Sequence, residues 1–399
     1  MRILHTADWH LGKNLEGVSR LDEQEKFLDD FVDIVKENNI DLVIVAGDIY
    51  DNSNPPARAE KLFYKTLKRI SNDNNTATLV ISGNHDNPDR LVAATPLAME
   101  HGIIMVGTPK TIVPVGRYGC VNVLESGEGY IEVELNKEKA VIITVPYPSE
   151  KRLNEVIYKD MEEDEEKAVS YSDKIFSLFN ELEKHYRDDT INIAVSHLFA
   201  MGSEEGGSER SIQLGGTYIV DSSCFPKKAQ YIALGHVHKP QIVPGTDKRA
   251  RYSGSPLQYN KKEISFKKKC YIVELKAKKE AIIEEVELKT YKPIDIWKCN
   301  SVEEAMNKCK ENTDRDSYVY LEIKTDRYIR QDEIKEMKGY KADILEITPI
   351  IEGADADYNY DEESSKSFEE LFIDFYKKIR KVEPEQEVID TLLSVMEQE

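Results

Sequence analysis

The sequence predicts an α/β fold in which strands and helices pack in layers. Over residues 1–150, short apolar runs alternate with segments whose apolar residues recur at helical spacing. The run from Leu42 to Ala46 is short, continuous and rich in β-branched side chains, which is typical of a buried strand. Strand and helix alternating in this order indicate a layered α/β architecture.

The elements expected before residue 150 begin with a strand, continue through helix, strand, helix and strand, and end in successive strands: 3–6, 21–38, 42–46, 57–70, 78–81 and 103–145. Residues 148–189 are predicted to be helical and polar. Apolar β-type runs then resume at 191–195, 231–234 and 270–275.

After Pro293 the pattern changes to that of a small α+β unit. Its expected elements are a helix, a strand, a helix and a strand: 302–311, 318–323, 331–337 and 344–347. A stretch with few large apolar residues follows and is typical of a linker, and the last segment contains two short amphipathic helices. We therefore expect the chain to divide into four parts: 1–275, 276–352, 353–367 and 368–399.

The composition indicates a protein of two or three domains without a membrane segment. At 399 residues the chain is too long for one ordinary core. No run approaches the roughly 20 apolar residues that span a bilayer, and no signal peptide follows Met1, so we expect a cytoplasmic protein. The five cysteines are scattered and never form a C-x-x-C pair, which argues against a disulfide framework or a zinc ribbon.

The net charge of −20 argues mildly against DNA as a ligand that this chain holds by itself. The excess is uneven, because residues 351–399 contain 15 acidic and 5 basic side chains. Such acidic runs are usually solvated helix faces or linkers.

Five short polar clusters each follow a predicted strand. They are Asp8-Trp9-His10, Gly47-Asp48, Gly83-Asn84-His85, Ser196-His197 and Gly235-His236-Val237-His238. In layered α/β folds, ligands gather at the carboxyl ends of strands, where side chains converge. We therefore expect the five clusters to share one edge of the fold.

The residue types in these clusters favour a pair of divalent ions. Aspartate, histidine and asparagine without cysteine suit Mn²⁺, Fe, Zn²⁺ or Mg²⁺. Seven ligands are too many for one ion, but they suit two ions about 3.5–4 Å apart bridged by one carboxylate, as in phosphoryl displacement. The candidate ligands are Asp8, His10, Asp48, Asn84, His197, His236 and His238. Three other histidines, His5, His101 and His185, are expected to be structural, and so is Trp9.

The five clusters resemble the motif set of the calcineurin-like metallophosphoesterases, and within them the chain is similar to the family of bacterial SbcD nuclease subunits. The similarity is strong from residue 1 to about residue 260 and weaker over the α+β unit and the helix at 368–380. It rests on five segments: 5–12, 47–51, 82–86, 235–241 and 252–256. It implies a four-layer β-sandwich flanked by helices, with a DNA-capping domain at 276–352 and a helical, partner-binding tail at 368–399.

The resemblance also implies a role for each site residue. One ion would take Asp8, His10, Asp48 and His238, and the other would take Asp48, Asn84, His197 and His236, so that Asp48 is the bridge. His85 would bind no metal and would assist catalysis at the scissile phosphate. Asp51 is not assigned a catalytic role, because more distant relatives carry histidine at the matching position.

The family's usual metal is Mn²⁺, and its substrate is DNA. Its members degrade duplex DNA from the ends and open hairpins and single strands, in DNA end processing, repair and recombination. They act as a homodimer bound to two copies of a coiled-coil ABC-type ATPase of the SbcC type, within a heterotetramer.

Two other functions are weighed against this one. A protein phosphatase or cyclic-nucleotide phosphodiesterase on the same scaffold is disfavoured, because Asn52-Ser53 and Asp86 stand where phosphatases usually have Arg-Gly and Glu. A scaffold that has lost its activity should lack ligands, and none is missing.

The apolar residues at helical spacing in the tail need a surface to bury them. That surface is either the chain's own body or, as the resemblance implies, the ATPase partner.

Overall fold

The computed structural model describes residues 1–72, 75–149, 171–209 and 218–351, together with 372–373, 376–377 and 384. The chain divides into two compact units, Met1–Tyr291 and Lys292–Glu399. The predicted linker at 353–367, nearly all of the predicted tail at 368–399 and part of the predicted helical stretch at 148–189 lie outside the described residues. Within the described ranges, no helix combines the length and the apolarity needed to cross a bilayer.

The first unit is built on two β-sheets. One sheet has six strands in the order β18-β17-β1-β4-β5-β6. Its strands are β1 Arg2–Thr6, β4 Leu42–Ala46, β5 Ala77–Ile81, β6 Ile103–Val106, β17 Lys269–Glu274 and β18 Ile282–Glu287. Strands β1, β4, β5 and β6 are parallel, so their carboxyl ends lie at the same edge, whereas β17 and β18 are antiparallel additions.

The other sheet has eight strands in the order β15-β16-β14-β11-β10-β9-β8-β7. Its strands are β7 Gly116–Tyr118, β8 Val121–Gly127, β9 Tyr130–Leu135, β10 Glu138–Val145, β11 Ile191–His197, β14 Tyr231–Gly235, β15 Gln241–Ile242 and β16 Ala250–Tyr252. Strands β10, β11, β14 and β16 are parallel. The carboxyl ends of these four strands therefore also lie at one edge of the sheet.

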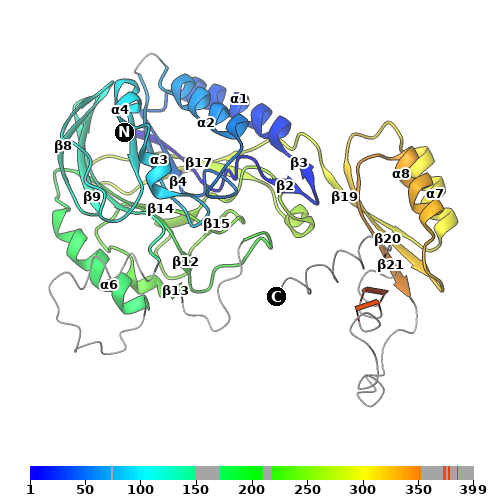
Figure 1. Ribbon diagram of the computed structural model, residues 1–399. Coiled ribbons are helices and arrows are strands. Elements are labelled where there is room, and N and C mark those ends of the chain that lie inside the picture. The colour runs from blue at the N-terminus through cyan, green and yellow to red at the C-terminus, as the bar shows by residue number, and fades with distance from the viewer. Residues whose placement is uncertain are drawn as a thin grey trace, which may run out of the picture. The chain divides into compact units, whose positions relative to one another are not determined.

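The two sheets pack face to face between layers of helices (Figure 1). Apolar side chains such as Ile44 and Ile193 form a buried core between the sheets. Helices α1 (Leu21–Glu37) and α2 (Ala57–Ile70) cover the outer face of the six-stranded sheet, and α6 (Tyr171–Leu182) covers that of the eight-stranded sheet. The predicted four-layer fold is confirmed.

Short elements complete the first unit. They are helices α3 Pro88–Val92 and α4 Thr95–Ala98, the 3-10 helices Met99–His101, Glu183–His185, Ser222–Cys224 and Lys261–Ser265, and the small pairs β2 Asn14–Leu15 with β3 Val18–Ser19 and β12 Phe199–Ala200 with β13 Ile219–Val220. All five cysteines are free thiols, as expected.

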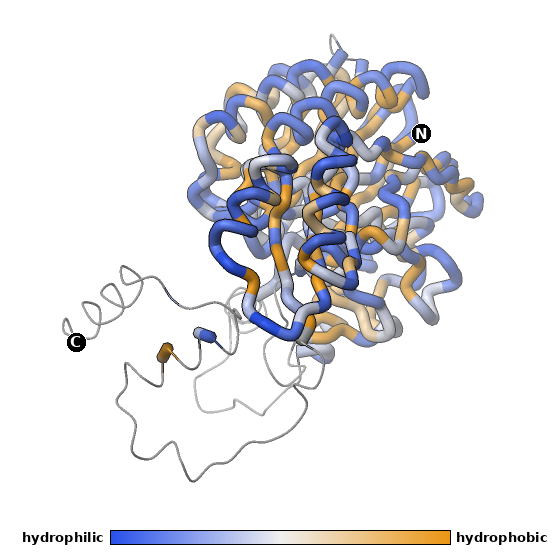
Figure 2. The backbone as a smooth tube through the Cα atoms, turned by 90° about the vertical axis from the view of Figure 1, so that its right-hand side faces the viewer, coloured by the Kyte–Doolittle hydropathy of each residue, from blue (hydrophilic) through white to orange (hydrophobic). Residues whose placement is uncertain are grey.

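Helix α1 shows why the helical spacing in the sequence predicts structure. Phe27, Leu28, Phe31 and Val35 are all buried, because residues three and four apart lie on the same helix face. The tube coloured by hydropathy shows the same alternation of hydrophilic and hydrophobic residues along the helices (Figure 2).

The second unit is a β-α-β-α-β arrangement with its own apolar core. Its elements are β19 Ile294–Cys299, α7 Val302–Glu311, β20 Tyr318–Thr325, α8 Gln331–Tyr340 and β21 Ile344–Ile351. The three strands are parallel, in the order β19-β20-β21. The sequence predicted the two helices and the last two strands but not β19.

The structure also places the division between the units later than the predicted position after residue 275. The reason is β18, whose residues Ile282–Glu287 pair antiparallel with β17 and so extend the sheet of the first unit.

Candidate metal centre

The polar clusters predicted from the sequence come together at the edge where the parallel strands of both sheets end. Backbone hydrogen bonds from Asp8 N to Gly47 O (3.0 Å) and from His10 N to Asp48 O (3.0 Å) hold the loops after β1 and β4 side by side. Across the sheets, Nδ1 of His197, at the end of β11, donates to the Ala46 carbonyl oxygen at 2.9 Å. The two sheets therefore present their loops to one site.

Asp48 lies at the middle of this site and is almost fully buried. Its Oδ2 lies 3.6 Å from His10 Nε2 on one side and 3.4 Å from His197 Nε2 on the other. Its Oδ1 accepts a hydrogen bond from the backbone N–H of His85 at 2.9 Å, which fixes the carboxylate plane. One carboxylate therefore faces two separate groups of side chains.

The first group contains Asp8, His10 and His238, whose ligand atoms lie within 4.8 Å of one another. The Nε2 atoms of His10 and His238 are 3.0 Å apart. Two nitrogens that bind one ion at about 2.1 Å and at a right angle to each other are separated by about the same distance. Asp8 is held in place by the backbone N–H of His236, which donates to its Oδ1 at 2.9 Å.

The second group contains Asn84, His197 and His236. Asn84 Oδ1 lies 3.0 Å from His197 Nε2 and 3.0 Å from His236 Nδ1. Because Nδ1 of His197 already donates to a carbonyl, its Nε2 is the nitrogen that points at Asn84 and Asp48. All seven residues predicted as ligands thus converge around the two oxygens of Asp48.

Two buried polar atoms of the first group have no hydrogen-bond partner among the described residues. They are Asp8 Oδ2 and His10 Nδ1. A buried carboxylate oxygen without a partner is costly unless a cation takes the place of the missing donor. The donor set and this unpaired oxygen both fit divalent metal.

The backbone around the candidate ligands is unusual. Asp8, His10, Asp48 and His236 have positive φ angles of 54°, 45°, 51° and 100°. Non-glycine residues rarely adopt such angles, and they persist where the surroundings enforce them, often at functional sites. The chain at Gly235 also approaches the backbone of Ala46 closely. Only glycine fits at position 235, because a Cβ there would lie 1.9 Å from the Ala46 carbonyl oxygen.

His85 lies beside the cluster without joining either group. Its Nδ1 donates to the Asp51 carbonyl oxygen at 2.6 Å, and its Nε2 is 3.9 Å from Asp48 Oδ2. A third set of possible ligand atoms joins His10, Asp51 and His85. However, the Asp51 carboxylate is already bound to Lys13 Nζ at 2.8 Å, which makes it a weaker candidate.

Burial and neighbouring charges strongly shift the pKa values of the cluster. Burial raises the pKa of Asp8 to about 7, against the opposing influence of His197 and His238. Burial lowers the pKa of His236 to about 3, with a further contribution from His197. For His197, burial lowers the pKa, but the charge of Asp48 outweighs it and raises the value to about 9. Such opposed shifts are typical of functional sites.

A buried ion pair that the sequence analysis missed supports His238 from behind. Glu263 is fully buried, and its Oε1 lies 3.3 Å from His238 Nδ1. Its Oε2 accepts a hydrogen bond from Lys268 Nζ at 2.6 Å. Burial opposes ionisation, but Lys268 and His238 hold the pKa of Glu263 well below its usual value. The residues stand in an ordinary-looking charged stretch, so nothing in the sequence marks them.

Asp86 is a second residue whose role only the structure shows. Its carboxylate accepts hydrogen bonds from the backbone N–H groups of Ile49 (3.1 Å), Tyr50 (3.0 Å) and Gly83 (2.8 Å). It therefore joins the loops after β4 and β5, which position Asp48 and Asn84. Burial raises the pKa of Asp86 to about 6, and the nearby charge of Asp48 adds to this effect.

His5, His185 and Trp9 make packing contacts within the fold. His5 is buried, with Nδ1 2.8 Å from the Tyr231 hydroxyl. His185 stacks on Tyr130, with ring centroids 3.6 Å apart. The Trp9 ring is fully buried and packs edge-on against three phenylalanines: Phe27, Phe31 and Phe63.

Comparison with known proteins agrees with this geometry. Residues 1–240 match the family model of the calcineurin-like phosphoesterases, and residues 290–380 match SbcD_C, the type 5 capsule protein repressor C-terminal domain. The chain is 40% identical to the SbcD subunit of the nuclease SbcCD from Bacillus subtilis strain 168, over 95% of this chain and 93% of that protein. It is 32% identical to the protein of the same name from Rhodobacter capsulatus, over 67% of this chain and 64% of that protein. The chain therefore belongs to the calcineurin-like phosphoesterases and, within them, to the SbcD family, which makes it a phosphodiester hydrolase that uses divalent metal.

Proposed function

We propose that the chain is the DNA-cutting subunit of a cytoplasmic complex with an SbcC-type ABC ATPase. In this role it acts as a double-strand exonuclease and as an endonuclease on single strands and hairpins, as part of DNA end processing. The observation that carries the proposal is the placement of Asp48 between two groups of ligands, each containing a pair of histidines. The name of the Bacillus subtilis relative, a nuclease subunit, supports DNA as the substrate.

Two Mn²⁺ ions are proposed as the cofactor. Asp8, His10 and His238 would hold one ion and Asn84, His197 and His236 the other, with Asp48 shared between them. The mixed oxygen and imidazole ligands, without cysteine, suit Mn²⁺ and related ions. Divalent ions supply Lewis acidity to such a site, drawing negative charge from the phosphate and activating water.

His85 is proposed as the catalytic residue that contacts the phosphate. Because its Nδ1–H is donated to the Asp51 carbonyl, its Nε2 is the nitrogen that faces the cluster. From there, when the ring carries a second proton as imidazolium, Nε2–H can donate that proton to an oxygen of the phosphate or of the leaving group. The bond to Asp51 holds the ring in that orientation, so Asp51 contributes through its backbone.

The basic residues near the polar clusters are poorly placed to bind DNA by themselves. Lys13 is bound to Asp51, Arg58 to Asp22, Arg90 to Glu60 and Lys239 to Glu204, while Arg20 is buried in an ion pair with Glu23. Their positive charge is therefore largely neutralised within the chain. This arrangement supports a nuclease that shares its DNA with a partner, which the net charge of −20 also favours.

The test is a set of nuclease assays with Mn²⁺ on linear duplex, hairpin and single-stranded DNA, with and without the ATPase. We expect the chain alone to cut single-stranded DNA, EDTA to abolish cutting, and ATP with the partner to stimulate cutting at duplex ends. A small diester such as bis-(p-nitrophenyl) phosphate serves as the control substrate. Hydrolysis of the small diester without cleavage of any DNA would favour another phosphodiesterase of the family.

Glu263→Gln is expected to lower Mn²⁺ affinity about 10–100-fold, because groups that orient a histidine ligand tune its affinity for metal. The substitution also leaves Lys268 buried without its carboxylate, at a cost of about 3–5 kcal/mol in the free energy of unfolding. Calorimetric Mn²⁺ titration and urea unfolding of the metal-free protein measure the two effects.

The double variant Glu263→Gln/Lys268→Met is the matched control. It removes the buried unpaired charge, so we expect stability to recover towards the wild-type value while Mn²⁺ affinity stays low. Wild-type affinity in the single variant would show that Glu263 does not position His238. Recovery of affinity together with stability would show that the metal effect came only from the loss of stability.

Truncation after Gly353 is expected to leave Mn²⁺-dependent cutting of single-stranded DNA intact and to abolish co-purification with the ATPase. The sequence after this point places Phe368, Leu371, Phe372 and Phe375 at helical spacing, a pattern of anchors used for docking into a partner's groove. Co-expression followed by pull-down measures the assembly. A full-length variant, Phe372→Glu/Phe375→Glu, should behave in the same way, and assembly of either variant with the ATPase would contradict the proposal.

A further inference from the structure

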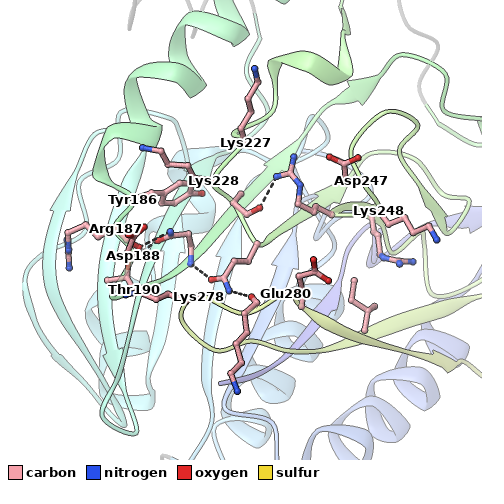
Figure 3. A pocket seen from close by; sticks show the side chains of 18 residues that line it. Tyr186, Arg187, Asp188, Thr190, Lys227, Lys228, Asp247, Lys248, Lys278 and Glu280 are labelled. Carbon is pink, nitrogen blue, oxygen red and sulfur yellow. Dashed lines mark hydrogen bonds between the residues drawn. The ribbon is translucent and has the colours of Figure 1, made fainter.

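A cavity of about 950 Å³ opens at the edge of the eight-stranded sheet opposite the candidate metal centre. It lies at the amino ends of β11, β14 and β16, whereas His197 and His236 lie at or just beyond the carboxyl ends of β11 and β14. Four chain segments line it: 186–192, 227–230, 247–251 and 278–283 (Figure 3). At about 3.3 Å per residue, the length of β11 from Asn192 to His197 separates the two sites by about 17 Å.

The lining of this cavity is basic, although the chain as a whole is acidic. Eight lining side chains are basic and three are acidic, a formal balance of +5 against −20 for the whole chain. Five of the basic side chains are exposed lysines that form no ion pair with a carboxylate in the described part of the chain: Lys227, Lys228, Lys248, Lys278 and Lys279. Their charge remains available to an anion. Arg187 differs, because it is bound at 2.9 and 2.7 Å to Glu132.

Hydrogen bonds hold the loops that carry these lysines. The Gln230 side chain accepts from the Asn192 backbone N–H at 3.0 Å and donates to the Lys276 carbonyl oxygen at 2.8 Å and to that of Lys279. This ties the β17–β18 turn, with Lys278, to the floor of the cavity. The Arg249 guanidinium donates to the carbonyl oxygens of Pro226 (3.0 Å) and Ala229 (2.8 Å), which flank Lys227 and Lys228. The backbone segments that carry these lysines are therefore held around the polar side chains of Gln230 and Arg249.

We propose that this cavity binds a polyphosphate anion, either inorganic polyphosphate or the phosphate chain of a nucleotide. Its volume is within the range of small-molecule sites, and lysine is a common phosphate ligand acting as a point charge. The aromatic residue of its lining, Tyr186, is buried and donates its hydroxyl to the Ile193 carbonyl oxygen at 2.5 Å, so it presents no free ring face to a base. Recognition therefore falls on the phosphates.

The test is calorimetric titration of the metal-free, full-length protein with inorganic tripolyphosphate and, separately, with ATP, in EDTA and physiological salt. EDTA prevents phosphates from binding through metal at the catalytic edge. We expect saturable one-to-one binding that weakens at least about tenfold in Lys248→Ala/Lys278→Ala, because each substitution removes a charge-assisted hydrogen bond to the phosphates. Equal affinity for both probes would identify the phosphate chain as the whole ligand, and tighter binding of ATP would identify a nucleotide.

The matched control is Lys26→Ala/Lys61→Ala, which removes the same charge from exposed positions on α1 and α2. It should bind both probes as the wild type does. Equal weakening in the control, or no saturable binding in the wild type, would overturn the proposal. Loss of duplex-DNA binding in the cavity variant, with no tripolyphosphate binding in the wild type, would also overturn it and identify a nucleic-acid contact surface.

Discussion

Replacing His85 by alanine is expected to leave Mn²⁺ binding intact and to slow DNA hydrolysis by about 10²–10⁴-fold. The structure places the His85 ring next to Asp48 but outside both groups of candidate ligands, with Nε2 3.9 Å from Asp48 Oδ2. Removing it takes away a proton donor or a stabilising charge at the phosphate and no ligand atom. The His85 backbone N–H, which fixes Asp48, is retained in the variant.

Calorimetric Mn²⁺ titration and single-turnover cleavage of a labelled oligonucleotide separate the two effects. His101→Ala, which removes a histidine distant from the cluster in the fold, is the matched control and should cut at the wild-type rate. Loss of one ion from His85→Ala would make His85 a ligand, in line with the alternative set that joins it to His10 and Asp51. Wild-type cleavage would remove His85 from the mechanism.

The fold could be predicted where one physical effect dominates the pattern. Strand β4 is apolar throughout because both of its faces are buried, and α1 repeats its apolar residues because one face packs on a sheet. Strand β19 was missed because it is half exposed: Ile296 is 39% exposed, and charged residues alternate with the buried ones. Strand β18 carries glutamates and is largely exposed, so only its pairing with β17 identifies it.

For the candidate site, too, the sequence pattern predicts some residues and misses others. Its seven converging residues could be predicted because each lies at or just beyond the carboxyl end of a strand and because their types suit a metal. Glu263, Lys268 and Asp86 act through contacts between distant segments, such as Asp86 with the backbone of Ile49 and Tyr50. The spacing of residues along the sequence cannot predict contacts between segments that are far apart in the chain. The basic cavity was missed for the same reason, because its lysines come from separate segments of the chain.

Asp48→Asn is expected to have the largest effect of all, with loss of at least one ion and slower hydrolysis than in His85→Ala. Asp48 Oδ2 lies between His10 Nε2 at 3.6 Å and His197 Nε2 at 3.4 Å, where a shared carboxylate would offset charge on two ions. An amide has no negative charge and only one oxygen, so it cannot bridge in the same way. Its NH₂ group would also place a donor against a cation.

The metal content of Asp48→Asn, measured by calorimetry and by elemental analysis after dialysis, tests the bridging role. Asp51→Asn is the matched control, because Asp51 is a nearby carboxylate whose oxygen lies 3.7 Å from His10 Nδ1 but is bound to Lys13. We expect this control to keep both ions. Two fully occupied ions in Asp48→Asn would overturn the bridge. Loss of an ion from Asp51→Asn alone would instead assign the carboxylate ligand to Asp51, and the pair of sites would then be centred on His10 rather than on Asp48.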